Sequence, residues 1–166
     1  MAEILYEQHH DELSLLNGVT PHLGDSREVL PSIVKDLKDH NVVYWLDGHW
    51  SGSETAGKEN ECPLLDELSC LSKRTEDIIL IDDARLFISP PPYPSKPEQW
   101  PTIQDIVTII SNFDKVPFLQ IIDDVIFIIP DKQELRSMLI NYAQQRSTIL
   151  WETFLKIQKQ NTQPHS

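Results

Sequence analysis

The sequence predicts an α/β fold, a three-layer sandwich with a mostly parallel sheet and an antiparallel hairpin near its C-terminal end. Two continuous apolar runs, at residues 42–46 and 78–81, have the length of strands that are covered on both faces. A helical pattern lies between them, which gives the strand–helix–strand crossover that joins parallel strands. Two further apolar runs, at residues 118–122 and 125–129, flank Asp123-Asp124 and predict the hairpin.

The first third of the chain carries signals for a helix, a strand and a second helix. Leucines at helical spacing predict an opening helix over residues 4–16, and Asn-Gly follows as a stop signal. Residues 19–23 are expected to form a brief strand. Asp25 or Ser26 can then cap a helix over residues 27–37.

The remaining elements include two more helices and a long proline-rich loop. Leucines at helical spacing predict a helix over residues 63–71. Six of the twelve prolines fall in residues 89–101, which we expect to form an ordered or semi-rigid surface loop. Helices are predicted over residues 102–113 and 132–159, and a flexible tail over residues 160–166.

Length and composition indicate one globular domain, over residues 1–159. A chain of 166 residues that is 40% hydrophobic and 24% charged fits neither the disordered nor the membrane class. The net charge of −12 would repel a phosphate backbone, so nucleic acid is not an expected partner. The sequence has no export signal and no apolar run of about 18 residues, so we expect a cytoplasmic protein without a membrane span. A fragment of a longer protein stays open as an alternative.

Unusual polar residues follow three of the predicted strands at the point where each ends. Ligands of open parallel sheets bind outside these carboxyl ends. If the strands at 42–46 and 78–81 are neighbours, Asp47, Asp82 and Asp83 converge within reach of one hard cation such as Mg²⁺. An acidic residue after a strand also often caps the next turn or helix, and this alternative stays open for each of the three. The strand ends are Gly24-Asp25-Ser26, Asp47-Gly48-His49 and Asp82-Asp83.

His49 follows Asp47 by two residues and lies beside the predicted cation. An imidazole there can act as a general base for a substrate hydroxyl, and the alternative is a structural hydrogen bond in a tight turn. Aromatic residues flank the predicted cleft, where they either stack on a ring or a sugar or fill hydrophobic space. They are Trp45, Trp50, Tyr93 and Trp100.

Three motifs, taken as a set, carry a resemblance to a known family. They are Leu23-Gly24-Asp25-Ser26 with Val29-Leu30-Pro31, Tyr44-Trp45-Leu46-Asp47-Gly48-His49-Trp50-Ser51-Gly52, and Ile79-Leu80-Ile81-Asp82-Asp83-Ala84-Arg85-Leu86-Phe87. Over about residues 5–130, the chain resembles a bacterial group of methyltransferase-like proteins within the class I S-adenosylmethionine-dependent methyltransferases. More distantly, the pattern is similar to the macrocin-type sugar O-methyltransferases, in which an Asp-Gly-Asp strand end and a later Asp-Asp pair hold a divalent metal.

The resemblance implies a role for each acidic residue at matching positions. The implied ligands of Mg²⁺ or a similar divalent cation are Asp47, Asp82 and Asp83. His49 occupies the position of the second Asp of Asp-Gly-Asp, which the family uses as the general base. The implied acceptor is a small-molecule hydroxyl, with a sugar as one candidate.

The methyl donor that the resemblance implies is S-adenosylmethionine, with Asp25 and Ser26 as the candidate cofactor-binding residues. The family's donor site needs a Gly-rich turn after the first strand, and the five glycines of this chain form no Gly-x-Gly cluster. The acidic residue expected at the end of the second strand is missing too. We therefore expect a Rossmann-like domain that lacks the first two strands of the methyltransferase fold and is impaired or inactive alone.

Without those strands, the strand at 42–46 has an open edge. Either residues 19–23 pair with it or a second chain fills the edge, which predicts a homodimer. The main function expected is metal-dependent O-methyl transfer, and the alternative is a degenerate, non-catalytic domain that acts in dimerisation or partner binding. Metal-dependent hydrolysis ranks last, because the sequence has no second cluster of His and Asp ligands.

Overall fold

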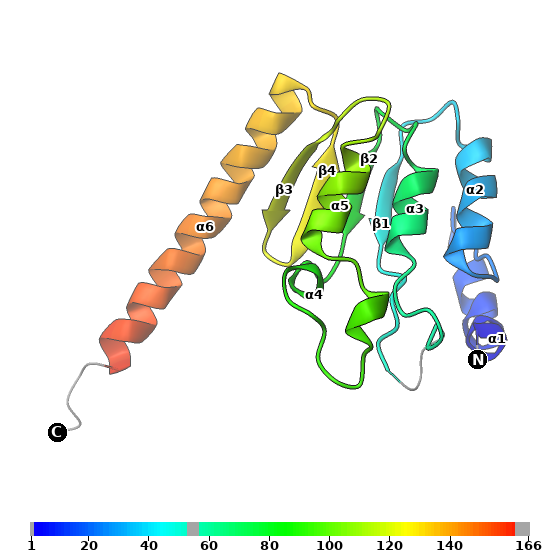
Figure 1. The fold of residues 1–166 in the computed structure, drawn as a ribbon, viewed down its shortest axis with the longest axis horizontal. Helices are drawn as coiled ribbons and strands as arrows, with labels where there is room; N and C mark the ends of the chain where they lie inside the picture. The colour runs from blue at the N-terminus through cyan, green and yellow to red at the C-terminus, as the bar shows by residue number, and fades with distance from the viewer. Residues whose placement is uncertain (1, 53–56, 162–166) are drawn as a thin grey trace.

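A computed structural model describes residues 2–52 and 57–161 (Figure 1). The predicted tail at 160–166 falls mostly outside these residues, although the last helix includes residues 160 and 161. The elements are α1 (Ala2–Ser14), α2 (Ser26–Asp36), β1 (Val43–Leu46), α3 (Leu64–Cys70), β2 (Ile78–Ile81), α4 (Arg85–Ile88), η1 (Pro97–Gln99), α5 (Ile103–Ile110), β3 (Phe118–Ile122), β4 (Val125–Ile129) and α6 (Gln133–Asn161).

The four described strands form one open, mixed sheet in the order β1-β2-β4-β3. β1 and β2 are parallel, and β4 is antiparallel to both β2 and β3. The α/β class, the strand–helix–strand crossover and the C-terminal hairpin are thus confirmed. The expectation of a mostly parallel sheet is wrong for these strands. A two-residue turn forces β3 and β4 to run antiparallel, and the hairpin inserts β4 against β2 in the reverse direction as well.

The predicted strand at 19–23 does not form, and this segment has no regular secondary structure and pairs with none of the described strands. Val19 and Leu23 at its ends are exposed, because no sheet face lies against them. Among the described strands, β1 therefore lies at the sheet edge with nothing hydrogen-bonded to its outer side. Pairing between residues 19–23 and β1 is excluded in this structure, whereas filling of the edge by a second chain stays a prediction.

The core lies between the sheet and the helices that cover one of its faces (Figure 1). α3 and α5 pack there, and α2 lies beside α3. Leu68 and Leu71 at the end of α3 and Ile106 in α5 are fully buried. The strands contribute alternate residues to this core, as the pleat of a β-strand requires. They are Tyr44, Leu46, Ile79, Ile81, Ile126 and Ile128.

The opposite face of the sheet carries a single described helix, α6, which lies beside β3 and then continues past the body (Figure 1). The expected three-layer sandwich is therefore incomplete, because one helix cannot cover the width of four strands. Among the described residues, no helix combines the length and the apolar composition needed to cross a membrane.

A buried ion pair fixes the beginning of β1 against the beginning of β2. Arg74 Nε donates to Asp77 Oδ2 at 2.5 Å, and the Asp77 side chain is 2% exposed. Asp77 Oδ1 accepts from the backbone N–H of Val42 at 3.2 Å. The Arg74 guanidinium also donates to backbone carbonyl oxygens of Leu37 and His40, which closes the turn after α2. This network sets the parallel register that brings the other ends of the two strands together.

We predict that Asp77→Asn lowers the free energy of unfolding by about 3 kcal/mol, because it leaves the Arg74 charge in a protein environment without its partner. Urea denaturation measures the change. Asp114→Asn, at an exposed carboxylate, should stay within about 0.5 kcal/mol of the parent. Equal midpoints for Asp77→Asn and the parent chain would show that the pair does not hold the register.

Candidate metal centre

The candidate site lies where β1 and β2 end at the same edge of the sheet. Leu46 and Ile81 are register partners, and the backbone N–H of Asp82 donates to the carbonyl oxygen of Leu46 at 3.1 Å. The next residues of both strands therefore leave the sheet side by side. This confirms that the two apolar strands are neighbours, which was the condition for the acidic residues to meet.

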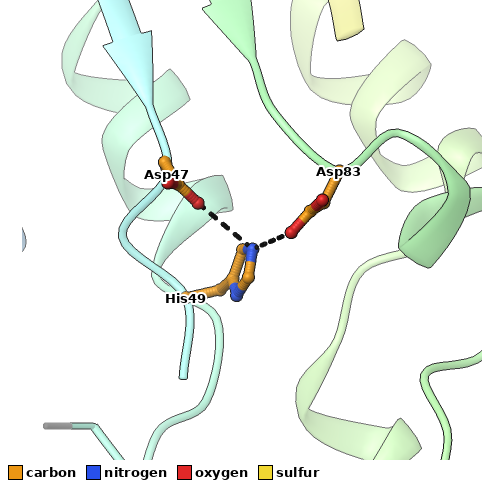
Figure 2. A group of neighbouring side chains, drawn as sticks. All are labelled: Asp47, His49 and Asp83. Atoms are coloured by element: carbon orange, nitrogen blue, oxygen red, sulfur yellow. Dashed lines mark hydrogen bonds and ion pairs between the residues drawn. The ribbon is translucent and has the colours of Figure 1, made fainter. Parts of the chain in front are cut away.

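Asp47, His49 and Asp83 converge on one point (Figure 2). His49 Nε2 lies 2.9 Å from Asp83 Oδ2 and 3.3 Å from Asp47 Oδ1. One ligand atom from each residue lies within 4.8 Å of the others. The exposed fraction is 9% for the His49 side chain, 24% for Asp83 and 51% for Asp47, so the group opens to solvent on the Asp47 side.

Contacts on two sides orient His49 and Asp83. The His49 ring packs against Trp100, with ring centroids 5.1 Å apart. The second oxygen of Asp83, Oδ1, lies 2.8 Å from the Arg85 guanidinium, which in turn pairs with Asp124. Asp83 thus faces an imidazole with one oxygen and a cation with the other. Arg85, which follows the Asp-Asp pair, holds that carboxylate in place.

The structure places Asp82 outside this group. Its Oδ1 accepts a hydrogen bond from the backbone N–H of Asp83 at 2.8 Å. Asp83 has a φ of 54°, in the left-handed region, so the chain turns sharply between the two carboxylates. Of the three predicted metal ligands, two meet, and the third position is filled by His49.

Asp25 and Ser26, the candidate cofactor-binding residues, lie at the beginning of α2 and are engaged within the protein. Asp25 caps the helix by accepting from the backbone N–H of Arg27 at 2.9 Å, and its Oδ2 lies 2.6 Å from the Arg27 guanidinium. The hydrogen bonds from Arg27 lower the pKa of Asp25. The Ser26 hydroxyl hydrogen-bonds with Glu67. These contacts match the capping role that the sequence left open.

The strand-end loops pack closely around Gly48. A Cβ atom at this position would lie 3.2 Å from Glu67 Oε1 and 3.7 Å from Ser26 Oγ. Burial raises the pKa of Glu67, and the hydrogen bond with Ser26 opposes this effect. Burial also raises the pKa of Asp47, against the attraction of His49 and with the help of the Asp82 and Asp83 charges. The site thus contains carboxyl groups that hold protons more tightly than in water.

A cleft of about 270 Å³ adjoins the group formed by Asp47, His49 and Asp83. His49 and Asp83 form part of its wall, and Trp50, Tyr93 and Trp100 are among the other lining residues. Three prolines of the proline-rich loop complete one side: Pro91, Pro92 and Pro94. The cleft therefore places the His49 imidazole and the Asp83 carboxylate beside an apolar wall that contains aromatic residues.

Glu61 anchors the proline-rich loop that lines this cleft. The residue is 1% exposed, and its Oε2 accepts from Trp100 Nε1 and from the backbone N–H of Lys96, both at 2.8 Å. The backbone N–H of Glu61 donates to Gln99 Oε1 at 3.0 Å. Sequence analysis missed Glu61 and Glu67, because a single Glu in a polar loop or a short helix has no pattern that marks it as buried.

The two distances from His49 Nε2 fit ligand atoms that share a divalent cation, and the shorter distance is also that of a hydrogen bond. Ligand atoms about 2.1 Å from one ion lie about 3.0 Å apart at adjacent octahedral positions and about 3.4 Å apart in a tetrahedron. The two distances from His49 Nε2 fall in this range. His49 Nδ1 is buried without a hydrogen-bond partner among the described residues.

We predict that Glu67→Gln stabilises the protein most at neutral pH. The raised pKa of Glu67 means that the folded state binds its proton more tightly than the unfolded state. In the parent chain, this group therefore adds stability as pH falls through its folded pKa, and the gain is complete below its ordinary value of 4.5. Glutamine keeps a partner for Ser26 and carries no charge.

The measurement is the difference in unfolding free energy between Glu67→Gln and the parent chain from pH 7.5 down to about 4.5. We expect this difference to shrink as pH falls. The exposed Glu98→Gln, which is remote from Glu67 in its charge interactions, serves as the control. Parallel curves for Glu67→Gln and the parent would contradict the prediction.

Comparisons with protein-family models, with curated proteins and with solved structures found no match to this chain. The methyltransferase-like assignment therefore stays a prediction that rests on the three sequence motifs.

Proposed function

We propose that Asp47, His49 and Asp83 bind a divalent cation and present it to a hydroxyl group in the adjoining cleft. The observation that carries this proposal is the approach of His49 Nε2 to one oxygen of each carboxylate, at 2.9 and 3.3 Å. Two carboxylates supply the negative charge that offsets a divalent ion. The imidazole favours a transition metal such as Mn²⁺ over Mg²⁺, which prefers oxygen ligands alone.

The chemistry proposed is O-methyl transfer from S-adenosylmethionine, as the sequence motifs imply. A bound cation lowers the pKa of a hydroxyl that coordinates it. Asp47 is the most exposed of the three residues and does not line the cleft, so it would hold the cation from the solvent side. His49 and Asp83 line the cleft in which the substrate hydroxyl would lie. In this arrangement His49 serves as a ligand instead of the general base that the resemblance implies.

The cleft favours a neutral, ring-containing acceptor. Tyr93 lines the cleft and is exposed, so its ring offers a face on which the apolar side of a sugar ring can stack. The chain's net charge of −12 disfavours an anionic acceptor. A sugar or another polyhydroxylated ring is therefore the proposed substrate class.

Metal binding is tested by thermal unfolding with and without Mn²⁺ or Mg²⁺. A cation at about 100 times its dissociation constant adds about 2.7 kcal/mol of stability, which raises the Tm of a domain of this size by about 5 °C or more. We expect this rise in the parent chain and its loss in Asp83→Asn. Asp82→Asn is the matched control, because Asp82 lies outside the group, and should keep the rise. If Mn²⁺ leaves the parent curve unchanged, the metal proposal is wrong.

A second candidate is a non-catalytic domain that works through association with a partner. The absence of a Gly-rich turn from the sequence and the unpaired outer edge of β1 favour it.

Calorimetric titration of S-adenosylmethionine into the metal-loaded chain tests whether the donor site is complete in one chain. The chain has no Gly-rich turn to receive the donor, so we predict no detectable heat at millimolar concentrations for the chain alone. Measurable binding would instead support a catalytic domain that is complete in one chain. Binding of Mn²⁺ without binding of the donor would support a metal-binding domain that needs a partner for transfer.

A further inference from the structure

One face of the sheet presents apolar side chains that the described chain leaves open. Val43 and Trp45 in β1 are 61% and 55% exposed. Ile78, Leu80 and Phe127 continue the same face across β2 and β4, because they are register partners of one another or of the β1 residues. A groove of about 360 Å³ runs between this face and α6, lined on the helix side by Leu135, Met138, Leu139 and Tyr142.

The open face has room for a second helix. Strands lie about 4.8 Å apart, so four strands span roughly 15–19 Å, whereas a helix with its side chains is about 10 Å wide. α6 contacts β3 and leaves the β1 side uncovered. The sheet face thus accepts two helices side by side, and the described part of the chain supplies one.

The second half of α6 exposes large apolar side chains that no other described element covers. Arg146 pairs with Asp123 in the β3–β4 turn at 2.8 Å, and from there the helix runs past the sheet (Figure 1). Beyond Arg146, six large apolar side chains are each at least 40% exposed. They are Ile149, Leu150, Trp151, Phe154, Leu155 and Ile157.

The stripe of α6 that faces the sheet continues through this protruding half. Leu135, Leu139 and Tyr142 line the groove in the first half. Steps of three or four residues along the same side of the helix lead on to Leu150, Phe154 and Ile157. The protruding half therefore has the same apolar side that the first half uses to contact a sheet.

We propose that two copies of this chain exchange the second halves of α6. Residues 147–159 of each copy pack on the open sheet face of the other, over β1 and β2 and beside the resident α6. One two-fold axis satisfies both copies, because each chain supplies one helix and receives one. This association is independent of the proposed metal site.

The buried area supports a second copy as the occupant. At about 100° per residue, Ile149, Leu150, Phe154 and Ile157 lie toward the side that continues the groove-lining stripe, whereas Trp151 and Leu155 lie on the other side. Four side chains that expose about half of areas on the order of 200 Å² each give roughly 400 Å² per helix, and the faces that receive them add a comparable area. The total for two exchanged helices, on the order of 1,600 Å², is that of a stable dimer.

The oligomeric state in solution tests the exchange, measured by light scattering and sedimentation equilibrium on the full chain up to about 100 μM, well above a micromolar dissociation constant. We expect a dimer. Phe154→Glu on the helix and Trp45→Glu on the sheet face should each lower the association constant at least about 100-fold, because each buries a carboxylate in an apolar contact. Circular dichroism checks that both variants fold.

Thr148→Glu is the matched control, because it adds the same charge six residues before Phe154 and on the side of α6 away from Leu150. It should remain a dimer. A parent chain that is monomeric at the highest concentration would overturn the proposal and leave the face to another occupant. A dimer that persists in Phe154→Glu or in Trp45→Glu would overturn it too, since pairing at the β1 edge does not need Phe154.

Discussion

The in-register parallel pairing of β1 with β2 decides where every polar group of the candidate site lies. At one end, the Arg74–Asp77 pair and the bond from Val42 to Asp77 fix the register. At the other end, Leu46 and Ile81 finish opposite each other. A slip of one residue would turn each side chain to the opposite face and separate the strand-end loops. A buried ion pair far from the site therefore determines the geometry of the site.

Local patterns in the sequence predicted the elements well, whereas contacts between distant segments decided the errors. The hairpin strands were predicted to the residue, because two apolar runs on either side of a two-residue turn are a local signal. The strand predicted at 19–23 failed because a strand needs a partner, and none of the described strands lies beside it. The sheet is mixed because β4, the second strand of the hairpin, pairs antiparallel with β2. No local pattern in either segment predicts which strand will be the neighbour of β2.

The position of the candidate site was predicted correctly, whereas only two of its three predicted metal ligands, Asp47 and Asp83, belong to the observed group. Adjacent apolar strands that end in carboxylates predicted that the acidic residues would meet. Which oxygens point inward depends on one turn, since Asp83 adopts a φ of 54° and Asp82 bonds to its backbone. His49 joins the group because the ring packs on Trp100. Glu61 positions Trp100 in turn, through a buried bond that no sequence pattern marks.

β1 and β2 have apolar side chains on both faces, but the described helices cover only one face of these two strands. A strand with one face in water normally alternates apolar and polar residues. β1 and β2 do not alternate, and Val43, Trp45, Ile78 and Leu80 are as apolar as their inward neighbours. Such strands are normally covered by other elements on both faces. The described helix on the second face, α6, lies along β3 instead. The same chain holds a helix end with six exposed, large apolar side chains, which is the kind of element that could cover the open face of the sheet.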